Sequence, residues 1–180
     1  MKKIIVLILL FVPVFCFAQN KIALSHFWDI PWGTTIDSAE EIFRERGFNT
    51  IREGRSLAAQ AQYEGEDAVI VLLFNRVNRF FSGNVVYLGN PNNVISKYQN
   101  YRRVLFRRYG MPDTAVELFV EPFEKGDGRE VEAIRTDNAF FFTEWEFGNG
   151  CFASVSIQSS LEVWLTFRSP VFTDLEIGSR

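Results

Sequence analysis

The stretch Arg129–Arg168 reads REVEAIRTDNAFFFTEWEFGNGCFASVSIQSSLEVWLTFR, and it decides the fold class. Apolar and polar side chains alternate along most of it, and many are aromatic or β-branched. Successive side chains of a strand leave opposite faces, so this alternation is typical of half-buried strands. The pairs Asp127-Gly128, Asp137-Asn138 and Asn149-Gly150, and more weakly Ser159-Ser160, favour tight turns. We therefore predict four strands of an antiparallel meander from Arg129 to Arg168.

Two amphipathic segments upstream predict helices. The first covers 36–46, with Thr34, Thr35 and Ser38 as candidate N-caps, and the second starts at Asn90-Pro91 and ends before Gly110 and Pro112. Gly47 and Gly110 follow the last apolar residue of each helix. We expect both glycines to adopt positive φ, with Phe48 and Met111 folding back on the preceding turn.

Further strands are predicted at 57–64, 69–74, 85–88 and 115–120. The segment 69–74 is continuously apolar, which predicts a central strand covered on both faces. The chain is therefore expected to form one α+β domain, in which two helices pack on one face of an antiparallel sheet of about seven or eight strands. A helix-plus-strands unit that occurs twice is an alternative description of the same order of elements.

The N-terminus predicts an export signal. Lys2 and Lys3 precede an apolar run at 4–15, and Cys16-Phe17-Ala18 suits signal peptidase cleavage before Gln19. We expect residues 1–18 to be removed, and residues 19–180 to form a periplasmic or secreted domain without a transmembrane span. Lipid attachment at Cys16 is the alternative, but the bulky residue before it favours soluble export.

Composition narrows the function classes. Removing Lys2 and Lys3 leaves 17 basic against 22 acidic residues, a net charge of −5, so the charge balance argues against nucleic-acid binding. Cys151 is the only cysteine left after cleavage, so no intramolecular disulfide can form. The single histidine, His26, has no cysteine, histidine or aspartate at a spacing typical of metal ligands. The sequence also contains no Gly-x-Ser-x-Gly motif of a serine nucleophile. We therefore predict neither a cofactor nor a metal, and interpret His26 as a surface or packing residue and Cys151 as a small, partly buried hydrophobic residue.

Two turns resemble those of a group of uncharacterised small exported bacterial domains. They are Ile30-Pro31-Trp32-Gly33-Thr34-Thr35, which enters the first helix, and Tyr109-Gly110-Met111-Pro112, which leaves the second. More distantly, the layout resembles the helix-on-sheet domains of outer-membrane assembly lipoproteins and β-lactamase inhibitor proteins. The resemblance implies protein–protein contact, and it transfers no catalytic residues.

Two polar groups offer alternative chemistry. Glu144 and Glu146 are expected on one strand face, about 7 Å apart along the chain, and such a pair could serve a small hydrolase of envelope glycans. A solvated polar face is the simpler interpretation. Arginines at the end of the second helix could bind an anion, although the helix dipole and solubility also explain them: Arg102, Arg103, Arg107 and Arg108.

The aromatic runs Phe80-Phe81 and Phe140-Phe141-Phe142 place rings on both faces of a strand. If helices cover one face, the other face must be covered differently or exposed, and exposed aromatic patches mark interfaces. Our leading hypothesis is a non-enzymatic envelope protein that binds a protein partner through a sheet face or edge. The candidate binding residues are Phe81, Phe140, Phe142 and Trp164. A structural subunit of an envelope assembly, with homo-oligomerisation, is a further alternative.

Overall fold

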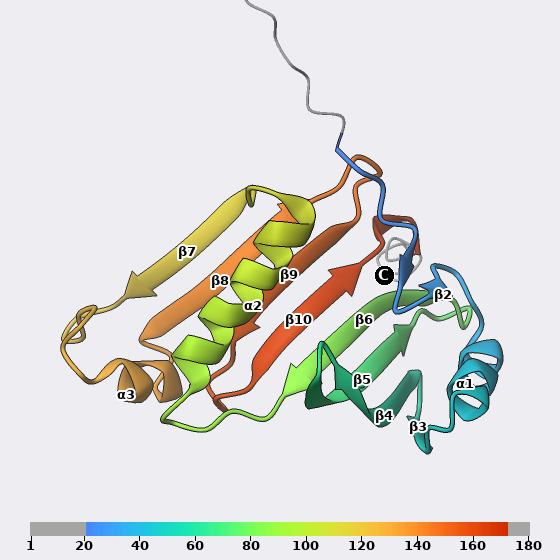
Figure 1. Cartoon of the computed structure of the whole chain (residues 1–180), viewed down its shortest axis with the longest axis horizontal. Helices are drawn as coiled ribbons and strands as arrows, with labels where there is room; N and C mark the ends of the chain where they lie inside the picture. Colours follow the sequence, from blue (N-terminus) through green and yellow to red (C-terminus); the bar gives the residue numbers. More distant parts are fainter. Residues whose placement is uncertain (1–20, 173–180) are drawn as a thin grey trace, which may run out of the picture.

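The computed structural model describes residues 21–172, and its main feature is an eight-stranded antiparallel sheet with helices on one face (Figure 1). The α+β prediction is confirmed. The strands are β1 (His26–Phe27), β2 (Ile30–Pro31), β3 (Thr50–Glu53), β4 (Ser56–Tyr63), β5 (Glu66–Phe74), β6 (Phe80–Tyr87), β7 (Thr114–Phe119), β8 (Ala139–Glu146), β9 (Phe152–Ile157) and β10 (Val163–Arg168). The helices are α1 (Ile36–Glu45), α2 (Val94–Tyr109) and α3 (Glu130–Arg135).

The large sheet consists of two similar halves. Its strand order is β3-β4-β5-β6-β10-β9-β8-β7, and each half is a helix followed by four strands of the sheet. The halves meet where β6 pairs antiparallel with β10. The short hairpin β1–β2 stands outside this sheet and precedes α1. The sheet thus contains the helix-plus-strands unit twice.

Both α1 and α2 pack on the same face of the sheet. Tyr98 of α2 shares a hydrogen bond of 2.7 Å with the Thr143 hydroxyl on β8. In the first half, Arg52 of β3 donates to Asp37 of α1 at 2.7 Å. The registers of the intervening strands put Arg52 and Thr143 on one side. The buried core lies between this side and the helices, since every second residue of the inner strands is buried there.

Both ends of α1 follow the expected pattern. The hydroxyl of Thr35 accepts a hydrogen bond from Ser38 N–H at 3.3 Å, which makes Thr35 the N-cap. Gly47 has φ +81°, and the Phe48 N–H donates to the Phe43 carbonyl at 3.0 Å. Together with the bond from the Gly47 N–H to the Arg44 carbonyl at 3.0 Å, this bond forms a Schellman motif, which satisfies carbonyls that the helix leaves free.

The second helix matches less closely. Gly110 has φ +85°, as predicted, but Met111 is 77% exposed and does not fold back. The helix α2 begins at Val94, later than the sequence predicts. Residues 90–93 instead form a separate turn, in which the Asn90 side chain accepts from the Asn92 N–H at 2.7 Å. Asn90 therefore stabilises the turn and does not cap the helix.

Two strand predictions are corrected. The first strand expected after Arg129 is the helix α3, so the meander contains three strands, β8 to β10. The prediction that 69–74 is covered on both faces is also wrong. In β5, alternate residues from Ala68 to Phe74 are buried, but Val69, Val71 and Leu73 between them are only half-buried. Within residues 21–172, no helix has the length and apolar character needed to cross a membrane.

Candidate functional site

The face of the large sheet opposite α1 and α2, called here the uncovered face, carries a mostly apolar row of side chains, in which Val86 of β6 is only 7% exposed. The strand registers place these residues directly beside one another across five neighbouring strands. Side chains that are opposite in adjacent strands lie about 4.5–5.5 Å apart at Cβ and form one surface. The row runs Phe142, Ser156, Trp164, Val86, Val69.

Two of the predicted binding residues lie in this row, Trp164 at its centre and Phe142 at its end on β8. Phe142 and Trp164 are half-buried, with Ser156 between them. The indole N–H of Trp164 donates to the Glu162 carboxylate at 2.9 Å, which restrains the ring. A restrained aromatic ring on an open sheet loses little conformational entropy when a partner covers it.

Phe140 lies further along β8 on the same face and is 47% exposed. Its cross-strand neighbour on β7 is Leu118, which is 52% exposed. Phe81, by contrast, does not join the surface. The β5–β6 register shifts beside Phe74, so Phe81 has no partner in β5, and only 7% of it is exposed. The structure therefore brings together three of the four predicted residues.

The next two rows of the uncovered face are mixed, with polar groups on β6 and β10 beside Val71 and Leu73 of β5. Asn84 is almost fully buried, accepts from the Thr166 hydroxyl at 3.0 Å and donates to the Val71 carbonyl at 3.4 Å. The Arg168 guanidinium lies over the Phe152 ring at 5.5 Å. Among the described residues, the Arg168 Nε is buried and has no hydrogen-bond partner. The uncovered face thus combines an aromatic row with adjacent polar groups, as protein interfaces do.

Glu144 and Glu146 share the uncovered face, and Trp145 between them points into the core, as the alternation predicted. Burial raises the pKa of Glu144, the carboxylates of Glu146 and Asp113 raise it further, and Arg168 lowers it. Glu146 borders a cavity with Lys21 and Asp113, but Glu144 does not line that cavity. The two carboxylates therefore share a face without sharing that cavity.

The four arginines of α2 do not form one group. Arg102 pairs with Glu117 of β7 at 3.2 Å, whereas Arg108 pairs with Glu64 at the β4–β5 turn at 2.6 Å. Arg103 Nε donates to the Gln99 carbonyl one turn earlier, and Arg107 is exposed. Because Arg102 and Arg108 reach different halves of the molecule, the structure does not bring the four together as one anion site.

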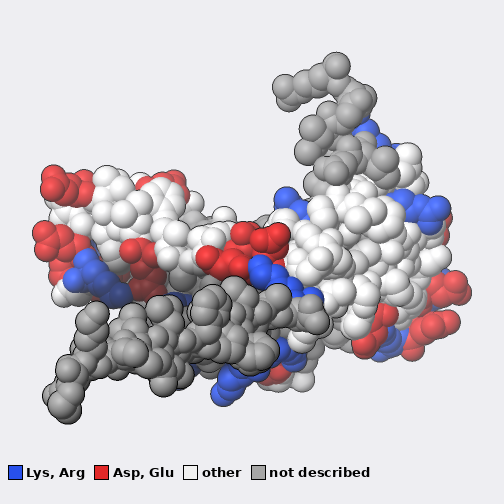
Figure 2. Space-filling model, turned by 90° about the horizontal axis from the view of Figure 1, so that it is seen from above, with Lys and Arg blue, Asp and Glu red and all other residues white. Residues whose placement is uncertain are grey.

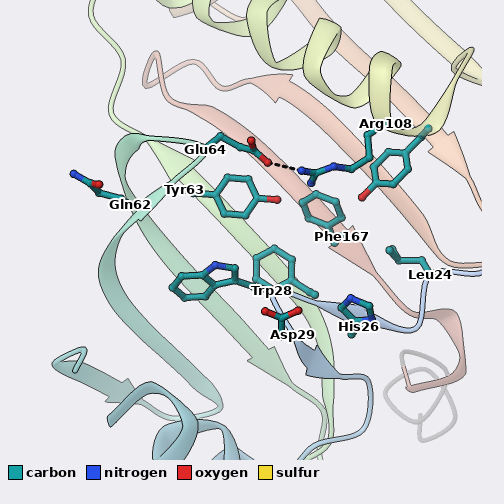
Figure 3. Close-up of a pocket in the computed structure, with 11 residues that line it drawn as sticks. Leu24, His26, Trp28, Asp29, Gln62, Tyr63, Glu64, Arg108 and Phe167 are labelled. Carbon is teal, nitrogen blue, oxygen red and sulfur yellow. Dashed lines mark hydrogen bonds and ion pairs between the residues drawn. The ribbon is translucent and has the colours of Figure 1, made fainter. Parts of the chain in front are cut away.

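A cavity of about 410 Å³ lies on the helix-bearing face where the two halves meet (Figure 3). Phe27 and Phe167 line it, with ring centroids 5.2 Å apart. Phe27 also lies over β6 at Gly83, where a Cβ would come within 2.2 Å of its ring. This close approach requires glycine at that position. Sequence reasoning missed the cavity, because its lining comes from four distant segments and forms no motif.

Polar groups surround the cavity. The Glu64–Arg108 ion pair lies on one side, and His26 and Asp29 lie on the other (Figure 3). Burial raises the pKa of Tyr63 to about 12, although Arg108 lowers it. The cavity could hold a small polar molecule, but the ion pair already satisfies Arg108.

The remaining candidates for catalysis, Cys151 and His26, do not lie together in one site. Cys151 is 1% exposed, and burial raises the pKa of its thiol, which disfavours the nucleophilic thiolate. His26 is exposed and its Nδ1 lies 2.9 Å from the Ser25 hydroxyl. Among residues 21–172, no three His, Cys, Asp or Glu side chains group in a way that could hold a metal ion.

Charged side chains are intermixed on the surface. Seen from above, acidic and basic residues lie close to one another, and uncharged areas separate the groups (Figure 2). Such a distribution does not favour a polyanionic partner.

Comparisons with protein-family models, with curated proteins and with solved structures found no match to this chain.

Proposed function

We propose that the protein is an exported, non-enzymatic binding protein that holds a protein partner on the uncovered face of its sheet. The observation that carries the proposal is the row from Phe142 through Trp164 to Val69, on a face that neither α1 nor α2 covers. Large apolar surfaces on a soluble domain mark interaction sites, and aromatic residues contribute most to binding.

The mixture of groups on this face also supports a protein partner. Aromatic and aliphatic side chains occupy one row, and the hydroxyl, amide and charged groups of the next rows lie beside it. A partner that buries the row would contact Trp164 near its centre and leave Glu144 and Arg168 available for polar contacts at the margin. This arrangement of an apolar centre and a polar rim is that of protein–protein interfaces.

The test is affinity capture from the protein's own envelope fraction, with matched variants. Trp164→Ala and Phe142→Ala remove rings from the row, and we expect each to abolish capture of a specific partner. Ile51→Ala is the control, since Ile51 is 72% exposed at the far edge of the same face and should leave capture unchanged. Equal capture by all variants would refute the proposal. N-terminal sequencing of the recovered protein tests export, with Gln19 expected first.

The hydrolase alternative has one observation in its favour, the raised pKa of Glu144. A carboxyl group that stays protonated nearer neutral pH is what a general acid needs. If the protein cleaves envelope glycans, Glu144→Gln should abolish the activity, and Glu162→Gln, at the residue before β10, should not. Unchanged glycan after incubation with the parent protein would remove this alternative.

A further inference from the structure

The strand β7 forms one edge of the large sheet and lacks the protection that edge strands normally have. Its residues Val116, Leu118 and the following Val120 are 38%, 52% and 43% exposed. They alternate along the chain and therefore lie on one side, the uncovered face. Exposed apolar edges of this kind pair with other strands, so soluble proteins usually shorten them or place charges on them.

The opposite edge shows the difference. Strand β3 has four residues, Thr50–Glu53, and two of them are charged. Strand β7 has six residues with one charge, Glu117, and that carboxylate is held on the helix side by Arg102 at 3.2 Å and Lys125 at 2.6 Å. No charged side chain of β7 therefore stands on the uncovered face.

The backbone of β7 is also available for pairing. The Val120 N–H donates to the Asn138 carbonyl at 2.8 Å, and the register pairs Leu118 with Phe140. Hydrogen-bonded pairs alternate along an antiparallel ladder, so the N–H and carbonyl groups of Glu117 and Phe119 point away from β8. Within the described residues, no strand pairs with β7 on that side.

We propose that two copies of this chain pair through β7, antiparallel about a two-fold axis at Leu118, and so join their two sheets into one. In this register Leu118 faces Leu118 of the second copy, and Val116 faces Val120. The uncovered face then carries an apolar row across the junction, flanked by Phe140 of each copy. The register centred on Glu117 would instead place two carboxylates opposite each other, which is destabilising.

The occupant of the edge is a second copy because the segment complements itself. An antiparallel strand keeps its faces only if residues of like parity are paired, and the Leu118 register then matches apolar with apolar at all three exposed positions. The proposal is independent of the partner-binding function, because it concerns the purified protein alone.

The first test is the oligomeric state in solution. We expect the parent protein to be a concentration-dependent dimer by analytical ultracentrifugation. Leu118→Lys places two ammonium groups at the axis and should weaken the dimer by at least roughly tenfold in dissociation constant. The control Ile51→Lys puts the same charge on the other edge and should leave the dimer intact. A monomeric parent, or a dimer that Leu118→Lys leaves unchanged, would overturn the proposal.

The second test fixes the register. Residues opposite each other without hydrogen bonds have Cα atoms about 4.5 Å apart, which a disulfide can span. Under oxidation, Leu118→Cys should therefore form a covalent dimer. Val116→Cys should form no more covalent dimer than the parent protein, because the introduced thiols would lie about 13 Å apart along the strands. Cross-linking of both variants alike, or of neither, would contradict the two-fold axis at Leu118. Thermal melts confirm that each variant is folded.

Discussion

At the scale of single residues, the two helix-ending glycines give a direct prediction. Gly47 and Gly110 have φ +81° and +85°, and a Cβ at either position would meet no atom within 4 Å. The cost of a side chain there is therefore backbone strain alone. We expect Gly47→Val and Gly110→Val each to reduce the free energy of unfolding by about 1–2 kcal/mol. Denaturant titration measures this, with exposed Glu41→Ala as the control. Equal stability of the three variants would contradict the left-handed assignment.

The tyrosines predict a dependence of stability on pH. Burial raises the pKa of all five tyrosines of the chain, to about 12 for Tyr63 and Tyr101. In the unfolded chain a tyrosine ionises near about pH 10. The unfolded state therefore loses protons first as the pH rises, so the stability that these groups contribute is complete below pH 10 and is lost towards pH 12.

Spectrophotometric titration tests this expectation. Tyrosinate absorbance of the native protein should rise well above the pH at which it rises in denaturant, and the melting temperature should fall over the same interval. Tyr63→Phe should make that fall shallower. Native tyrosines that ionise together near pH 10 would show that the rings are not buried as described.

Phe81 shows where residue-level prediction stops. Alternation predicts that Phe140 and Phe142 share one face of their strand, and the regular register of β8, β9 and β10 puts Trp164 on that face too. Phe81 lies where the β5–β6 register shifts, and a shift of one residue changes which side a side chain faces. Neither the Phe80-Phe81 pair nor its neighbours mark such a bulge in the sequence.

At the scale of elements, the hairpin β1–β2 carries backbone strain. Its two turn residues, Trp28 and Asp29, have φ +48° and +62°, although such turns favour glycine at the second position. Trp28 is held by contacts with Phe43 and Phe48, whereas Asp29 borders the cavity between the halves. The strain at Asp29 thus coincides with a side chain that a ligand could contact.

We expect Asp29→Gly to raise the free energy of unfolding by roughly 1 kcal/mol, because glycine adopts the left-handed conformation without strain. Asp29→Asn is the matched control, since it removes the charge and keeps the side chain. If both variants gain the same free energy of unfolding, the gain comes from removal of the carboxylate and not from relief of backbone strain. Chemical denaturation followed by circular dichroism distinguishes the two.

The helix α3 shows the limit at this scale. Its six residues, Glu130–Arg135, lie between two pairs that also suit hairpin turns, and fewer than two helical turns carry too few residues for the helical period to show. Tertiary packing decides the outcome, because Ala133 and Ile134 are buried. The longer elements α1, α2 and β8–β10 contain several repeats of their period, so the sequence predicts them well.

At the scale of the whole molecule, the boundary between the two halves was beyond sequence reasoning. The pairing of β6 with β10 joins residues about eighty positions apart, and no residue pattern within either strand predicts which strand it pairs with. The same holds for the cavity, where His26, Tyr63, Arg108 and Phe167 come together only because the halves meet. Local patterns predict strands and faces, whereas the order of strands depends on long-range packing.

That boundary predicts that the two halves unfold together. Leu165 of β10 is fully buried beside Val85 of β6, and Phe27 of the first half packs on Phe167 of the second. Leu165→Ala should cost about 2–5 kcal/mol through the cavity it leaves. Because the core is continuous, we expect hydrogen exchange to accelerate equally in β5 and β9, although they lie in different halves.

The control for this comparison is Ile51→Ala, which truncates an exposed side chain on the β3 edge and should change exchange little in either half. If Leu165→Ala accelerated exchange in β8 and β9 but left β4 and β5 protected, the halves would be separate folding units. Since all eight residues of β6 are buried, that strand would become an exposed apolar edge if the second half opened alone. The loss of this cover is the physical reason to expect one cooperative transition.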